Sequence, residues 1–192
     1  MPQMILASTS KYRRELLQRL VPEFVCQSPG VDENSWFREG RSPAQLATLL
    51  AAAKAESVFS QHPDAVVIGS DQVVDLNGRT LGKPGSREAS VTQLSQLSGQ
   101  THRLLTAVCV CSPEIRYELL HITTLRMRAL SLSEIHRYVD RDQPFDCAGS
   151  YQIESLGISL FDAIETTDFT SIMGLPLMPL ASHLRSLGIN VP

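Results

Sequence analysis

The chain has 192 residues, of which 43% are hydrophobic and 19% are charged, and its formal net charge at pH 7 is −3. This composition is that of an ordinary globular protein, long enough to bury one substantial core or to form two lobes that share a cleft. The slightly negative charge argues against nucleic acid as a partner, because such surfaces are usually basic. No stretch approaches the roughly 20 apolar residues that cross a bilayer, and the first residues do not resemble a secretory signal. We therefore expect a cytoplasmic protein with no membrane or nucleic-acid partner.

Hydrophobic patterning predicts alternating strands and helices along the first half of the chain. Hydroxyl residues precede the apolar helical runs, and Ser42 followed by Pro43 is the strongest helix-start signal. Asn77 and Gly78 mark a tight turn after an extended segment. The predicted strands are residues 4–7, 24–27, 65–68 and 73–76, and the predicted helices are residues 11–20, 43–60 and 87–98.

The second half of the chain contains two long strand-like runs separated by a Ser-Pro-Glu turn, which predicts an antiparallel hairpin. Cys109 and Cys111 lie two apart in the first run, so they share a face, and we expect buried thiols rather than a disulfide or zinc framework. The predicted elements are hairpin strands over residues 102–111 and 115–127, a helix from Ser133 through Tyr138, a strand over residues 157–161, and a last helix over residues 179–187. Together with the first half they predict a mixed α/β fold.

The segment of residues 6–14 joins a buried strand to a helix through three consecutive hydroxyl residues that begin at Ser8. A helix N-terminus offers unpaired N–H donors and a partial positive charge. Arg13 and Arg14 follow in the first turn, where cations oppose the helix dipole unless an anion joins them, and a phosphate chain is a natural anion. A capped surface helix with solvated arginines explains the segment equally well.

Three further charged positions are candidates for chemistry. Asp71 directly follows a buried apolar strand, which suits a general base or a metal ligand. Lys83 lies between a glycine and a proline, as a fixed phosphate clamp would, and Glu33 follows a Pro-Gly turn and a second acid. Each also has an ordinary interpretation, as a turn-forming aspartate, a solvated lysine and a solvated acid. The sequence contains no Walker loop, dinucleotide glycine fingerprint or nucleophile elbow.

Taken in order, the segments LASTSKYRRELL, VDE, AAAKA, GSDQVV, LGKP, CAGSYQIESLG and GLPL resemble the Maf family of nucleotide pyrophosphatases, over nearly the whole chain. The resemblance implies a single Maf-like domain over residues 1–192 and a fold related to the inosine triphosphatases. That fold is an elongated α/β structure with a mixed sheet, flanking helices, and two lobes around a central cleft. The implied activity is hydrolysis of a nucleoside triphosphate between its α and β phosphates, with Mg²⁺ or Mn²⁺ as the divalent metal cofactor.

The resemblance also implies roles for individual residues. Asp71 falls on the position of the general base, and Glu33 is expected to help it hold the metal. The positions that line the phosphate and metal region are Ser8, Arg13, Lys54 and Lys83. Composition alone would have assigned Lys54 to the surface of a helix, so its role depends on the resemblance.

Three positions separate the substrate branches of the family. Members that act on dTTP and UTP have arginine, threonine and glutamine there, whereas members that act on 7-methyl-GTP have an aromatic residue, glutamine and glutamate. This chain has Tyr12, Gln72 and Glu154 and therefore resembles the second branch. N7-methylation leaves guanine cationic, which favours stacking on Tyr12 and attraction to the carboxylate of Glu154.

Three departures from the family pattern bear on substrate choice and leave Asp71 unchanged. Lys11 stands where proline is usual, Tyr12 where tryptophan is more typical, and Ser155 where glycine is usual. A dTTP or UTP pyrophosphatase is therefore an alternative, as is a nucleotide-binding regulator of septum formation, a role also linked to the family. Family analogy implies a homodimer.

Overall fold

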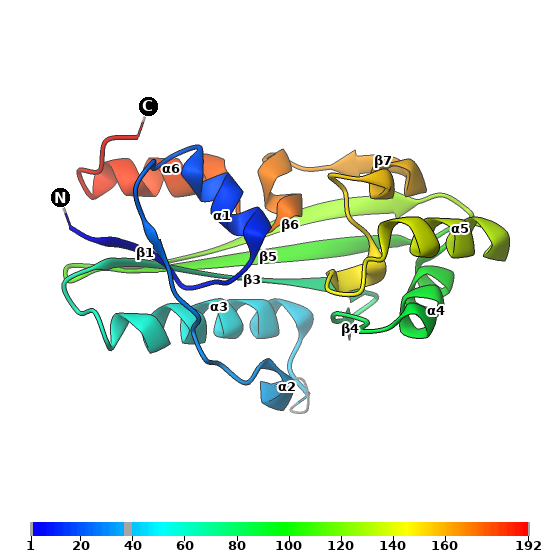
Figure 1. The fold of residues 1–192 in the computed structure, drawn as a ribbon, viewed down its shortest axis with the longest axis horizontal. Helices are drawn as coiled ribbons and strands as arrows, with labels where there is room; N and C mark the ends of the chain where they lie inside the picture. The colour runs from blue at the N-terminus through cyan, green and yellow to red at the C-terminus, as the bar shows by residue number, and fades with distance from the viewer. Residues whose placement is uncertain (1, 37–39, 192) are drawn as a thin grey trace. The chain divides into compact units, whose positions relative to one another are not determined.

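The computed structural model describes residues 2–36 and 40–191, in which strands and helices are interspersed along the chain (Figure 1). The strands are β1 (Met4–Leu6), β2 (Val25–Cys26), β3 (Val66–Leu76), β4 (Arg79–Leu81), β5 (Thr101–Cys111), β6 (Arg116–Met127) and β7 (Phe161–Glu165). The α-helices are α1 (Lys11–Gln18), α2 (Glu33–Trp36), α3 (Pro43–Phe59), α4 (Arg87–Leu97), α5 (Leu132–Asp142) and α6 (Leu177–Ser186). Short 3-10 helices are η1 (Ala148–Ser150), η2 (Leu156–Leu160) and η3 (Phe169–Met173).

The described residues form one mixed sheet of seven strands in the order β2-β1-β3-β5-β6-β7, with β4 also paired to β3. β1 is parallel to β2 and to β3, whereas β4 is antiparallel to β3 and β7 is antiparallel to β6. The predicted α/β class and mixed sheet are confirmed.

The chain divides into two compact units, each discontinuous in sequence. Unit 1 comprises residues 1–71, 106–121 and 168–192, and unit 2 comprises residues 72–105 and 122–167. One boundary falls inside β3, so Asp71 belongs to unit 1 and its neighbour Gln72 belongs to unit 2. The single domain expected over the whole chain remains a prediction.

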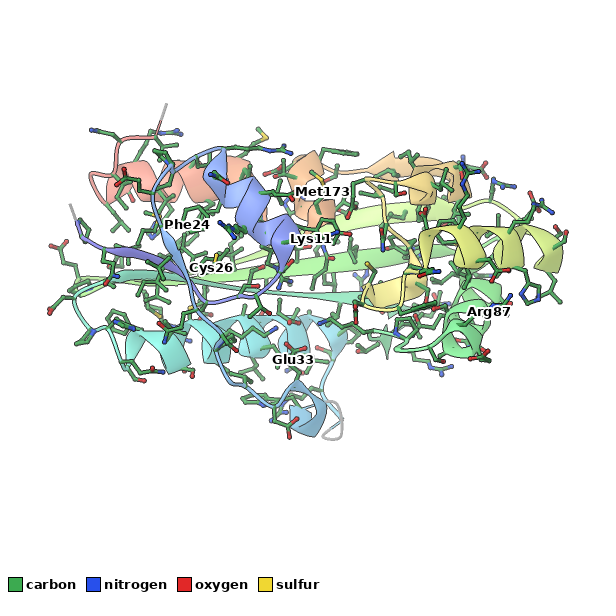
Figure 2. All side chains as sticks on the ribbon, in the orientation of Figure 1. Lys11, Phe24, Cys26, Glu33, Arg87 and Met173 are labelled. Carbon is green, nitrogen blue, oxygen red and sulfur yellow. The ribbon has the colours of Figure 1, made fainter. Side chains whose placement is uncertain are left out.

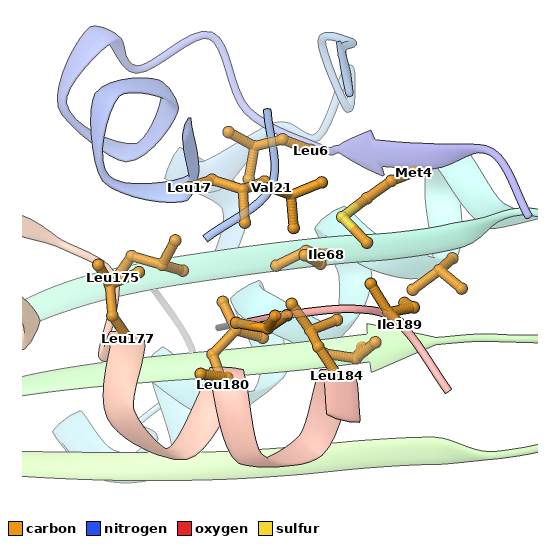
Figure 3. Packing of buried hydrophobic residues seen from close by; sticks show 14 of the residues in the cluster. Met4, Leu6, Leu17, Val21, Ile68, Leu175, Leu177, Leu180, Leu184 and Ile189 are labelled. Carbon is orange, nitrogen blue, oxygen red and sulfur yellow. The ribbon is translucent and has the colours of Figure 1, made fainter. Parts of the chain in front are cut away.

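In unit 1, helices cover both faces of β1 and of the first part of β3. Leu6 of β1 is fully buried in a cluster with Leu17 of α1 and Leu184 of α6 (Figure 3). Its neighbour Ile5 points to the opposite face and packs in a second cluster with Val58 of α3. Burial on both faces explains why these parallel strands are continuous apolar runs in the sequence.

In unit 2, α4 packs against α5 and η1. β3 turns into β4 at Asn77 and Gly78, which both have positive φ, as the Asn-Gly signal predicts. Tyr151 contacts Phe161 edge to face with ring centroids 5.0 Å apart, and its hydroxyl lies 3.1 Å from His102 Nε2. Burial lowers the pKa of His102 to about 4, so this imidazole is neutral inside the unit.

Two strand predictions were wrong in ways that have a physical reason. The predicted strands at residues 65–68 and 73–76 are one continuous strand, because Ser70 and Asp71 are buried within β3 rather than ending it. The predicted strand at residues 157–161 is instead η2, and β7 begins at Phe161, where that prediction ended. The other predicted strands, at residues 4–7, 24–27, 102–111 and 115–127, are confirmed within a few residues.

Two helix starts also differ from prediction. Ser131, rather than Ser133, is the N-cap of α5, because Ser131 and Glu134 form a reciprocal capping box. α6 begins at Leu177, two residues before the predicted start, and Asp168 Oδ2 accepts a hydrogen bond from the Met178 N–H at 2.7 Å. The three helices predicted in the first half are confirmed, with Ser10, Ser42 and Ser86 as their N-caps.

Cys109 and Cys111 are buried free thiols with their sulfur atoms 3.8 Å apart, as predicted. Within the part of the chain that the structure describes, every helix is too short or too polar to cross a bilayer.

Candidate active site

The centre of the candidate site is an ion pair inside unit 1. Lys54, on α3, places its Nζ 2.6 Å from Oδ1 of Asp71 on β3, and the two side chains are 6% and 7% exposed. Charged groups are rarely buried without a partner of opposite charge. Here Lys54 and Asp71 compensate each other's charge. Lys54 is therefore buried and paired with Asp71, although its composition context suggested the surface.

Glu33 is the second carboxylate at Lys54. Its Oε1 lies 2.6 Å from Lys54 Nζ, and its side chain is 37% exposed, so it is the more open of the two acids. Glu33 begins the short helix α2, which contacts α3, and Figure 2 shows it beside α3. One ammonium group thus pairs with two carboxylates that are far apart in sequence.

A close approach of strand and helix makes this pair possible. A Cβ placed on Gly69 of β3 would lie 2.4 Å from the Ala51 carbonyl oxygen and 2.6 Å from the Ala55 backbone nitrogen. Only glycine fits against the α3 backbone at this separation, and the alanines of α3 keep that face of the helix flat. In the segment AAAKA, the small alanine side chains therefore permit the close contact with Gly69. The longer Lys54 side chain of the same segment pairs with Asp71.

Arg13 is positioned by a carbonyl from the other end of the chain. Its Nε donates a hydrogen bond to the Gly174 oxygen at 3.0 Å, and Ser70 Oγ donates to the same oxygen at 2.8 Å. Gly174 has φ +105, and a Cβ there would lie 3.2 Å from Arg13 Nε. The oxygen of Gly174 thus links Arg13 on α1 to the residue that precedes Asp71.

The charges of this cluster act on one another. Burial raises the pKa of Asp71 above its usual value, and the nearby cations of Lys54 and then Arg13 oppose that rise. Burial lowers the pKa of Arg13, while the carboxylates of Asp71 and Glu33 oppose that fall. An arginine keeps its charge through such shifts, so the site holds two cations against two acids.

The hydroxyl segment before α1 also lies in unit 1. Ser8 is buried, and its Oγ accepts a hydrogen bond from the Ser10 N–H at 3.2 Å. Ser10 caps α1 by accepting from the Arg13 N–H at 3.4 Å. Tyr12 is half-buried, and Lys11 Nζ lies 4.8 Å from the centre of its ring. Lys11 therefore lies over one face of the ring that was predicted to stack on a cationic base.

The remaining predicted residues, Gln72, Lys83 and Glu154, belong to unit 2. Gln72 is half-buried, and Lys83 and Glu154 are exposed. Burial raises the pKa of Cys147 to about 11, the charge of Glu154 adds to the rise, and the charge of Lys83 opposes it.

The two carboxylates at Lys54 fit a divalent cation of the Mg²⁺ class. Such ions take oxygen ligands, commonly one or two carboxylates, and fill the other positions with water and substrate phosphates. Glu33 and Asp71 supply that number of carboxylates around one point. Among the described residues no group of three or more histidine, cysteine and acidic side chains could form a protein-only metal cage.

Sequence reasoning missed the residues that position this cluster. The Gly174 oxygen accepts hydrogen bonds from Arg13 and Ser70, and Gly69 leaves room for α3. None of Ser70, Gly174 and Gly69 was proposed for a role from the sequence. All three residues lie in the segments GSDQVV and GLPL. The resemblance of these segments to the family was therefore the only sequence signal for them, because none of the three is charged.

Comparison with known proteins gives consistent matches over the full chain. The profile of the family described as Maf, "Maf-like protein", matches residues 3–187. A protein of Xanthomonas axonopodis pv. citri named "7-methyl-GTP pyrophosphatase" is 51% identical over 192 residues, which is 100% of both chains. One of the same name from Bdellovibrio bacteriovorus is 46% identical over 187 residues, covering 97% of this chain and 98% of the relative.

Solved structures show the same fold at low sequence identity. The Staphylococcus aureus Ham1 protein superposes with a TM-score of 0.54 at 14% identity, over 96% of this chain and 99% of that one. A HAM1 protein from Coxiella burnetii gives a TM-score of 0.52 at 12% identity, over 97% and 100%.

Proposed function

Because this chain belongs to the Maf family, we propose that it is a nucleotide pyrophosphatase that hydrolyses the bond between the α and β phosphates of a nucleoside triphosphate. The products are the nucleoside monophosphate and pyrophosphate, and one water molecule is consumed. The observation that supports this most strongly is the buried pair of Asp71 and Lys54 with Glu33 beside it. A base, a cation and a second acid around one point are the groups that phosphoanhydride hydrolysis needs.

Asp71 is the proposed general base. It accepts a proton from the water that attacks the α-phosphorus in line with the departing pyrophosphate. Burial makes this carboxylate more basic than a solvated aspartate, and the cations of Lys54 and Arg13 oppose that rise in its pKa. Lys54, Arg13 and Lys83 offset the negative charge that grows on the pyrophosphate, and Ser8 contributes a hydroxyl to the phosphate region.

Glu33 and Asp71 would hold the divalent cation, Mg²⁺ or Mn²⁺, together with phosphate oxygens. When bound, the cation neutralises phosphate charge and polarises the bond that is cleaved. Lys54 lies 2.6 Å from an oxygen of each acid and keeps the two together.

The proposed substrate is 7-methyl-GTP. Close relatives over the full length carry that activity in their names, and the chain has Tyr12, Gln72 and Glu154 at the three positions that separate the branches. Stacking on Tyr12 and attraction to Glu154 both favour a cationic base over neutral guanine. We further propose a cytoplasmic location and a homodimer, with no nucleic-acid or membrane partner.

A panel of triphosphates tests this proposal. Pyrophosphate release is measured from 7-methyl-GTP, GTP, dTTP and UTP, with Mg²⁺, with Mn²⁺ and with EDTA. We expect the highest kcat/KM on 7-methyl-GTP and loss of turnover in EDTA. Higher values on dTTP and UTP would assign the chain to the other branch, and tight binding without hydrolysis would favour the regulator.

A further inference from the structure

Glu154 lies in a tight turn that is tied to the end of helix α5. We call residues 152–157 the Glu154 turn. The Asp142 carboxylate, at the last position of α5, accepts hydrogen bonds from Ser155 Oγ on Oδ1 at 2.9 Å and from the Leu156 N–H on Oδ2 at 3.0 Å. These two bonds hold the residues that directly follow Glu154.

The other side of the Glu154 turn is held by Tyr138, one helical turn before Asp142 on the same helix. The Tyr138 hydroxyl accepts a hydrogen bond from the Gln152 N–H at 2.9 Å. Tyr138 itself is buried in this unit. Two side chains of α5 therefore form hydrogen bonds with the turn on both sides of Glu154.

The turn is also closed on itself. The Gln152 oxygen accepts from the N–H groups of Ser155 at 3.2 Å and Gly157 at 3.0 Å. A Cβ on Gly157 would lie 2.2 Å from that same oxygen, so only glycine fits at this position of the turn. Glu154 is exposed at the middle of this closed turn, with its backbone held and its side chain at the surface.

The position of Asp142 is unfavourable for helix stability. A carboxylate at the C-terminal end of a helix opposes the partial negative charge there, and the helix ends directly after it, at Gln143 with φ 48. An acid at such a position needs compensating contacts, and the bonds to Ser155 and Leu156 supply them. Ser155, which replaces the usual glycine, supplies one of these bonds through its hydroxyl.

We propose that Asp142, assisted by Tyr138 and Ser155, is a positioning residue that fixes the Glu154 carboxylate for recognition of the nucleobase. The inference rests on the proposed function, in which Glu154 selects the cationic base. Asp142 does not contact the substrate in this proposal. It acts through the backbone of the turn, so its removal changes selectivity only while Glu154 is present.

The test compares kcat and KM for 7-methyl-GTP and GTP in Asp142→Ala, Asp142→Asn and Ser155→Ala. Asp142→Ala is expected to lower the selectivity for 7-methyl-GTP over GTP about 10-fold, through KM, because it removes two bonds to an ionised group. Ser155→Ala removes one bond and is expected to lower selectivity about 3-fold. Asp142→Asn keeps an acceptor for Leu156 and a partner for the Ser155 hydroxyl, so it is expected to restore most of the selectivity.

Asp140→Ala is the matched control. Asp140 lies on the same helix and pairs with Arg87 of α4 at 2.6 Å, away from the turn. It is expected to leave selectivity unchanged. Equal losses in Asp140→Ala and Asp142→Ala would show a general effect of α5 stability and would overturn the proposal.

A double-mutant cycle with Glu154→Gln separates this inference from the proposed function. If Glu154→Gln lowers selectivity and Asp142→Ala adds little to it, the two residues act through one another, as proposed. The inference fails, while the proposed function stands, in either of two outcomes in which Glu154→Gln lowers selectivity. In the first, Asp142→Ala alone leaves selectivity unchanged. In the second, the losses of the two single variants add in full in the double variant. If Glu154→Gln leaves selectivity unchanged, the proposed role of Glu154 fails first, and the inference fails with it.

Discussion

Lys54 Nζ lies 2.6 Å from Asp71 Oδ1, and less than a tenth of either side chain is exposed. Buried ion pairs add little stability compared with apolar residues of the same size, because desolvation opposes the attraction between the charges. Removing one partner alone is strongly destabilising, since it leaves a buried charge uncompensated. The pair is therefore better explained by the chemistry that it makes possible than by the stability of unit 1.

Asp71→Asn is expected to lower turnover at least about 10²-fold, because general-base help typically contributes about 10²–10⁴-fold. The asparagine oxygen can still accept a hydrogen bond from Lys54, and Glu33 still compensates the charge of Lys54, so the fold should be kept. The measurement is pyrophosphate release alongside thermal unfolding at pH 7. Near-normal turnover would remove Asp71 from the role of base, and a large fall in Tm would mean that the variant tests stability instead.

Lys54→Met is expected to shift the acidic limb of the kcat/KM profile to higher pH. Burial already raises the pKa of Asp71, and Lys54 is the main group that opposes this, so its loss raises the pKa further. The base is then protonated over a wider range of acidic pH. Lys54→Arg keeps the charge and serves as the control, with a limb close to that of the wild type.

Lys54→Met is also expected to change how the stability of the folded protein depends on pH. In the folded state the pKa of Asp71 lies above its unfolded value, so the folded protein binds more protons between the two values. This contribution to stability is fully present below the unfolded pKa and is lost as the pH rises through the folded pKa. In Lys54→Met the loss extends to higher pH, and it is measured as the midpoint of urea unfolding across the acidic to neutral range. A midpoint that follows the wild-type pH curve would contradict the coupling of Lys54 to Asp71.

Gly174→Ala is expected to raise KM for every triphosphate in the panel about 10-fold by displacing Arg13. The new Cβ would lie 3.2 Å from Arg13 Nε, at a backbone φ of +105 that alanine rarely adopts. The strain itself costs on the order of 1–3 kcal/mol of stability. Gly188→Ala is the control, since Gly188 also has positive φ but open space around its Cβ position. Both variants should lose stability, and only Gly174→Ala should lose substrate affinity.

The sequence was most informative where the signal is local. The helix α3 was predicted at its observed start because Ser42 and Pro43 are adjacent, and the capping box with Gln45 lies within the same few residues. The start of α5 was misplaced although the same kind of box, Ser131 with Glu134, was present in the sequence. That error was avoidable, since the spacing of serine and glutamate distinguishes Ser131 from Ser133.

The candidate site was less predictable because its contacts join segments that are distant in sequence. Asp71 looked like the end of a strand because a polar pair interrupts the apolar run, yet β3 continues through it, since Lys54 compensates the buried acid. The approach of α3 that brings Lys54 there depends on Gly69, which carries no charge and gives no local signal of a site. The link from Arg13 to Gly174 spans 161 positions, so periodicity or capping could not have shown it.

Lys11→Ala is expected to raise the selectivity for 7-methyl-GTP over GTP about 2- to 5-fold. Lys11 Nζ lies 4.8 Å from the centre of the Tyr12 ring, and an exposed contact of this kind is worth about 0.5–1 kcal/mol. The ammonium competes for the ring face with a cationic base and repels it, whereas a neutral guanine is subject only to the first effect. Arg14→Ala is the control, because it removes a positive charge three residues further along the same helix. It accounts for the general attraction of positive charges to the triphosphate group, which is the same in both substrates. Selectivity that stays the same in Lys11→Ala, or that rises equally in Arg14→Ala, would mean that Tyr12 does not receive the base on the face that Lys11 covers.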